Sequence, residues 1–127
     1  MEKRNVIGRY FSHDELKCRC CDVNQMDQVF VDTLDQIREN YGKPMMVTSG
    51  FRCTKHNKKV GGSDFSAHLE GLAVDIAITD SKLRHQLIKA IMSIETASYS
   101  DTISFGIHEN FIHIDQFYRA FPKVFLY

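Results

Sequence analysis

The chain has 127 residues, of which 43% are hydrophobic and 25% are charged. This length favours one domain with a buried core, so we expect residues 1–127 to form a single domain whose segment 1–24 is largely irregular. The 16 basic and 16 acidic residues balance, which gives no electrostatic reason to expect nucleic-acid or membrane binding. The charged N-terminus lacks an apolar run, so we expect cytoplasmic synthesis without a signal peptide or membrane span.

The first half of the chain predicts helices and one strand. Residues 12–15 have a capping-box pattern, which predicts a turn of helix. Apolar residues recur at helical spacing over 26–41, and Gly42 ends this helix. Residues 45–49 are typical of a strand, whereas 53–67 indicate a loop with room for one helical turn.

The second half predicts three strands and a helix. In the strand 72–78, large apolar residues alternate with a row in which alanines flank Asp75. A helix follows over 81–97, and 103–107 and 111–115 form a hairpin. Together these elements predict an α+β fold, with a small antiparallel sheet packed on helices.

Two histidines and one aspartate fall where this sheet would bring them together. Asp75 and His113 occupy the non-core faces of their strands, and His68 precedes the first strand by a tight turn at Gly71. Two imidazoles and one carboxylate are the smallest protein ligand set of a catalytic zinc, which keeps one position for water. A lone strand histidine is more often a core residue, but a buried carboxylate needs a cation or hydrogen-bond donors. The three residues together therefore predict a metallohydrolase.

Four cysteines allow a second interpretation of metal binding. Cys18, Cys20 and Cys21 are close in sequence, and Cys53 lies further along the chain. Reduced, partly buried thiols are the favoured interpretation for a cytoplasmic chain. A structural zinc site is the alternative.

The same segments resemble a known family. Residues 66–75 (Ser-x-His-x-x-Gly-x-Ala-x-Asp) and 111–115 (Phe-x-His-x-Asp) are similar to zinc peptidases of the D-Ala-D-Ala carboxypeptidase superfamily, the M15 family with the hedgehog/DD-peptidase fold. Residues 48–52 match its Ser-Gly-aromatic-Arg element, and 56–62 match the loop that follows. Residues 11–21 resemble the N-terminal element of small phage and prophage members, so the resemblance covers nearly the whole chain.

The resemblance implies a site and a reaction. His68, Asp75 and His113 would bind one catalytic Zn²⁺, and the substrates would be peptide bonds in peptidoglycan stem peptides or cross-links. Arg52 would stabilise the oxyanion or hold a substrate carboxylate. Ser66 would orient the ligand loop or a substrate group.

The resemblance does not identify the general base. Several branches of the superfamily place an acidic residue three positions before the last histidine, where this chain has Asn110. Asp115 shares the face of His113 and is the first candidate, either as a base or as the partner of a ligand histidine. Glu109 in the adjoining turn is the second candidate base, and His108 is a further candidate as a proton donor.

Two functions follow. The first is a zinc peptidoglycan peptidase, endolysin-like or wall-remodelling, that accumulates inside a cell and acts on the wall once released, as in phage lysis. The second is a non-catalytic zinc-binding module that binds peptide or cell-wall fragments, an idea that rests on Asn110. The bond cut, the choice between exo- and endopeptidase activity, and the oligomeric state are left open.

Overall fold

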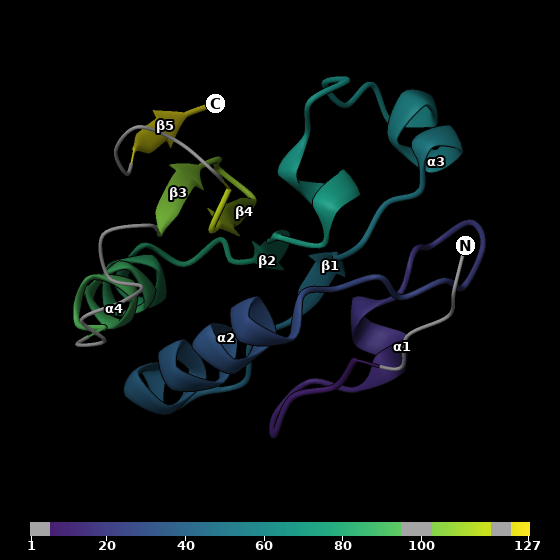
Figure 1. Cartoon of the computed structure of the whole chain (residues 1–127). Helices are drawn as coiled ribbons and strands as arrows, with labels where there is room; N and C mark the ends of the chain where they lie inside the picture. The colour runs from purple at the N-terminus through teal and green to yellow at the C-terminus, as the bar shows by residue number, and fades with distance from the viewer. Residues whose placement is uncertain (1–5, 95–102, 118–122) are drawn as a thin grey trace.

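A computed structural model describes residues 6–94, 103–117 and 123–127 and contains one five-stranded sheet (Figure 1). The helices are α1 (His13–Leu16), α2 (Gln28–Tyr41), α3 (Thr54–Lys59), the 3-10 helix η1 (Ala67–Glu70) and α4 (Ser81–Met92). The strands are β1 (Val47–Ser49), β2 (Ala73–Ala77), β3 (Ser104–Ile107), β4 (Phe111–Asp115) and β5 (Val124–Leu126). This arrangement confirms the predicted α+β class.

The sheet has the order β1-β2-β4-β3-β5. All neighbours are antiparallel except β3 and β5, which pair in parallel. The predicted hairpin of β3 and β4 is confirmed, and β4 also pairs with β2 so that Asp75 lies opposite His113. Strand β5 was not predicted, and it extends the sheet beyond the hairpin.

The core lies between one face of the sheet and helices α2 and α4, which lie below the strands in Figure 1. The large residues of β2 and β4 point into it, as the alternation predicted, and are almost completely buried: Val74, Ile76, Ile112 and Ile114. The opposite face of these strands is therefore free to carry polar side chains. The segment with α3 and η1 lies on that side (Figure 1).

The helix boundaries follow capping residues. Asp27 and Asp80 accept backbone hydrogen bonds at the starts of α2 and α4, and Gly42 ends α2 with a left-handed φ of 74°. Helix α4 ends at Met92, so the helix predicted over 81–97 was too long: residues 93 and 94 are not helical, and 95–97 lie outside the described residues. An apolar stripe continues past the helix end because Ile94 packs into the core without being helical.

The other N-terminal predictions are confirmed with small changes. Helix α1 has the predicted capping box, and the strand predicted over 45–49 shortens to β1. The predicted loop 53–67 contains α3 and the start of η1. Within the described ranges, no helix combines the length and apolar character needed to cross a membrane.

Candidate metal centre

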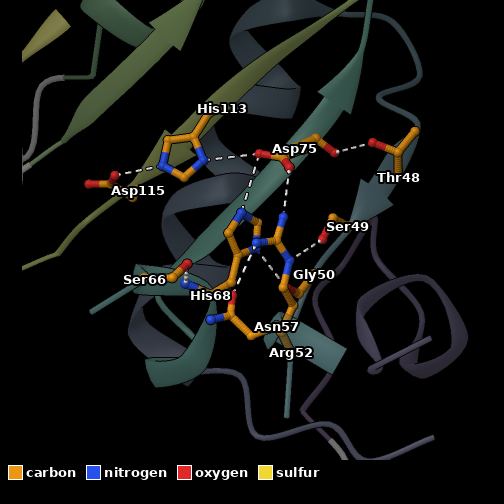
Figure 2. A network of polar contacts seen from close by, with 10 residues as sticks. All are labelled: Thr48, Ser49, Gly50, Arg52, Asn57, Ser66, His68, Asp75, His113 and Asp115. Atoms are coloured by element: carbon orange, nitrogen blue, oxygen red, sulfur yellow. Dashed lines mark hydrogen bonds and ion pairs between the residues drawn. The ribbon is translucent and has the colours of Figure 1, made fainter. Parts of the chain in front are cut away.

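Three ligand atoms from separate elements meet on the polar face of the sheet (Figure 2). Asp75 Oδ1 lies 2.9 Å from Nδ1 of His113 and 3.3 Å from Nε2 of His68. These three atoms all lie within 4.8 Å of one another, and the three residues are buried. The cross-strand pairing of β2 and β4 sets the first distance, and η1 supplies the third ligand.

A glycine turn and a serine cap hold His68 over the sheet. Gly71 ends η1 at φ 70°, and a Cβ there would lie 2.1 Å from the Gln25 carbonyl oxygen, so only glycine fits. Ser66 Oγ accepts a hydrogen bond of 3.3 Å from the backbone N–H of His68. This contact is the kind required of a residue that orients the ligand loop.

Each histidine has a partner that fixes which ring nitrogen faces the other ligands. The Gly50 carbonyl oxygen lies 2.8 Å from Nδ1 of His68 and can only accept, so Nδ1 carries the proton and Nε2 keeps its lone pair. Asp115 Oδ2 lies 2.7 Å from Nε2 of His113, which leaves Nδ1 to face Asp75. Partners of this kind orient metal-binding histidines.

Arg52 completes the polar group. Its NH2 nitrogen lies 3.4 Å from Asp75 Oδ2, while Nε donates to Ser49 Oγ and NH1 donates to Asn57 Oδ1. The two oxygens of Asp75 thus have different neighbours: Oδ1 faces the histidines and Oδ2 faces the guanidinium. Because its side chain is only 15% exposed and held on three sides, Arg52 presents a fixed positive charge beside the ligand atoms.

The ionisation of the group reflects the same contacts. Burial alone would raise the pKa of Asp75, but the hydrogen bonds from His113 and His68 outweigh it and hold that pKa well below its usual range. Burial alone would lower the pKa of His113, but its hydrogen bonds to Asp115 and Asp75 raise it to about 9. A proton on His113 therefore occupies the place between the ligand atoms that a metal cation would take, and this donor set fits zinc.

This competition predicts opposite pH responses with and without metal. The raised pKa of His113 stabilises the metal-free fold fully below about 6.5, and the stabilisation is lost as the pH rises through about 9. Zinc affinity should instead rise over this interval, with about one proton released per ion at neutral pH. Calorimetric titration of Cys20→Ser/Cys53→Ser, which lacks two of the four clustered thiols, in buffers of different ionisation enthalpy measures the release. Binding without proton release would contradict the prediction.

The ligand atoms lie in a cavity of about 580 Å³. Its other walls come from η1 and the loop before it, from β4, and from a C-terminal segment that the sequence did not assign to the site: Phe125, Leu126 and Tyr127. The rings of Phe125 and Tyr127 each lie 6.4 Å from the His113 ring. An unbroken run of large apolar and aromatic residues over 124–127 is the signal that the sequence offered for this strand.

The turn between β3 and β4 lies outside this cavity. Glu109 and Asn110 are exposed there, and His108 stacks on Phe111 with ring centroids 4.4 Å apart. Of the described residues, the only carboxylates that line the cavity are Asp75 and Asp115. The structure thus brings Arg52, Ser66 and Asp115 together with the three ligands, but not Glu109.

A model of the family described as Peptidase M15 matches residues 9–115. The chain belongs to the peptidase M15 family. No curated protein gives a significant match. Membership confirms the M15 family predicted from the motifs and supports a metallopeptidase. The buried His68–Asp75–His113 group could hold the metal of this M15 member.

Proposed function

We propose that this M15 peptidase uses one zinc ion to hydrolyse peptide bonds in peptidoglycan stem peptides or cross-links. The carrying observation is the convergence of Nε2 of His68, Oδ1 of Asp75 and Nδ1 of His113 in one cavity. Gly50 and Asp115 engage the opposite nitrogen of each ring, so Nε2 of His68 can bind a metal directly and Nδ1 of His113 can do so once it gives up its proton. Peptidoglycan as substrate rests on the family resemblance.

Bound zinc would polarise the scissile carbonyl and lower the pKa of a water ligand towards about 7. The remaining work falls to residues of the chain. Arg52 holds a fixed guanidinium beside Asp75, where it stabilises negative charge developing on the carbonyl oxygen. The same fork could instead pair with a substrate carboxylate. Ser66 keeps His68 in place through its contact with the backbone of η1.

Digestion of cell walls tests this proposal. The purified protein, stripped of metal and then reloaded with zinc, is incubated with walls of several peptidoglycan types, and released fragments are identified by mass spectrometry. We expect zinc-dependent release of peptides, whose masses also distinguish loss of a terminal D-Ala from cutting of a cross-link. No zinc-dependent cleavage of any wall type would overturn the proposal. The same assay with wall added from outside represents an enzyme released from the cell.

The geometry favours one of the two roles open to Asp115. This carboxylate is completely buried, accepts from Nε2 of His113 and also accepts from the backbone N–H of Phe117. It contacts the nitrogen of His113 that faces away from Asp75. We therefore infer that Asp115 positions His113 and does not act as the base, and Glu109 lies outside the cavity-lining residues.

Replacing Asp115 with asparagine separates these roles. If Asp115 only positions His113, Asp115→Asn should weaken zinc binding by about 10- to 100-fold, because the amide oxygen still accepts from His113 but carries no charge. Saturating zinc should then restore most of the activity, with an unchanged pH profile. Full zinc occupancy with lost activity would instead assign Asp115 as the base. Zinc occupancy is measured by competition with a chromogenic chelator in a Cys20→Ser/Cys53→Ser background, which removes two of the four clustered thiols.

One observation keeps a binding function as a second candidate. Within the described part of the chain, no carboxylate lines the cavity except Asp75, a ligand candidate, and Asp115, which is engaged by His113. A protein without a base would bind wall peptides in this cavity without cutting them. Zinc-dependent binding of wall fragments with no cleavage in the digestion assay would establish this alternative.

A further inference from the structure

A second group of potential metal ligands lies outside the catalytic cavity. It is called the cysteine cluster here and consists of Cys18, Cys20, Cys21 and Cys53. The four Sγ atoms all lie within 4.8 Å of one another, although the first three cysteines are more than thirty positions from the fourth. We propose that the cysteine cluster binds a structural zinc ion.

The sulfur positions fit one tetrahedral ion. With Zn–S bonds of about 2.3 Å, tetrahedral geometry places neighbouring sulfurs about 3.8 Å apart. In the structure, Sγ of Cys20 lies 3.9 Å from Sγ of Cys18 and 3.3 Å from Sγ of Cys53. Cys18 and Cys21 have the C-x₂-C spacing that is frequent in structural zinc sites. Convergence of all four sulfurs is needed for a shared ion, whereas two disulfides would need only pairs.

Backbone hydrogen bonds hold the segments that carry the cysteines. Cys18 and Val23 close a tight turn through a 2.7 Å hydrogen bond from N–H to carbonyl, and Asp22 in that turn has a φ of 60°. Two N–H groups also point at sulfur: that of Cys53 lies 3.4 Å from Sγ of Cys18, and that of His56 lies 3.4 Å from Sγ of Cys53. Such donors stabilise negative charge on sulfur, which favours the thiolate form that binds metal.

The location gives the ion a structural role. Residues 50–53 run between the cysteine cluster and the catalytic cavity, and the Phe51 N–H donates to the Leu16 carbonyl at 2.9 Å. The same segment supplies the carbonyl of Gly50 and the N–H of Arg52, both of which contact His68. An ion at the cluster would therefore join residues 18–21 to the segment that orients His68 and carries Arg52.

Metal counting on separate variants tests this proposal independently of the proposed function. Under reducing conditions the wild-type protein should hold about two zinc ions per chain, and Cys20→Ser/Cys53→Ser should hold about one. His68→Ala/Asp75→Ala should also hold about one, retained by the cysteine cluster. Asp22→Asn is the matched control, since asparagine tolerates the left-handed conformation of that turn and removes no sulfur, and it should keep both ions.

Cobalt substitution identifies the ligands. Thiolate-to-cobalt charge-transfer absorption should appear in wild type and in His68→Ala/Asp75→Ala, and should be absent from Cys20→Ser/Cys53→Ser. A wild-type protein with about one zinc ion and no thiolate absorption would overturn the cluster proposal while leaving the catalytic one intact. The cluster proposal would also be overturned if His68→Ala/Asp75→Ala held no zinc while Cys20→Ser/Cys53→Ser held as much as wild type.

Thiol labelling of the wild-type protein gives a test that does not depend on folding of a variant. The zinc-loaded protein should resist alkylation, and all four cysteines should react after chelation. Chelation should also lower the melting temperature of His68→Ala/Asp75→Ala, which has no catalytic ion to lose. A mass lower by two hydrogens per bridge, with thiols absent until reductant is added, would establish disulfides and overturn the proposal.

Discussion

Replacing Asp75 with alanine should abolish both zinc binding in the catalytic cavity and hydrolysis. The change removes the one oxygen that lies near both ligand nitrogens, at 2.9 and 3.3 Å. It also leaves the guanidinium of Arg52 without its ion-pair partner at a site where its side chain is 15% exposed. Uncompensated charges of this kind cost roughly 3–5 kcal/mol of stability when fully buried, so the cost here is smaller.

Glu70→Gln is the matched control for Asp75→Ala. Glu70 is an exposed carboxylate at the end of η1, two residues after His68. Its replacement should leave zinc content and wall digestion unchanged. Zinc content is measured by elemental analysis after gel filtration, with the cysteine cluster removed by Cys20→Ser/Cys53→Ser in both proteins. Retention of a stoichiometric ion by Asp75→Ala in this background would contradict the assignment of the ligands.

Replacing Arg52 with alanine should reduce kcat by about 10²- to 10³-fold while zinc remains bound, which is the cost of losing one oxyanion-stabilising group. The reason is the position of the guanidinium, which contacts Asp75 through the oxygen that faces away from the histidines. Arg52→Lys should recover little activity, because an ammonium cannot reproduce the three directed contacts to Ser49, Asn57 and Asp75.

Two model peptides distinguish whether Arg52 stabilises the oxyanion or binds a carboxylate of the substrate. If it stabilises the oxyanion, Arg52→Ala lowers kcat equally for a peptide with a free C-terminal carboxylate and for its amide. If it binds the substrate carboxylate, the change raises KM for the free acid and has little effect on the amide. We expect the first result. Lys55→Ala removes an exposed cation from the neighbouring helix α3 and should change neither constant.

The strands β2 and β4 show what the local sequence pattern could predict. Alternation in β2 and β4 assigned Val74 and Ile112 to the core and Asp75 and His113 to the other face, and the structure agrees. This works because side chains of a strand alternate with a period of two, which the sequence displays directly. The helix predicted over 81–97 failed at its C-terminal end for the opposite reason: apolar spacing reports burial, and Ile94 is buried without being helical.

The three ligand candidates could be named from the sequence, because motif and strand pattern coincide at those positions. Only the tertiary structure decided which atom of each faces the others, since that depends on the Gly50 carbonyl and the Asp115 carboxylate, contacts that spacing does not encode. Tertiary structure likewise placed β5 beside β3 and gathered four sulfurs from segments far apart in the chain. A sequence fixes periodicity and ligand types locally, whereas pairing across long separations follows from packing of the whole core.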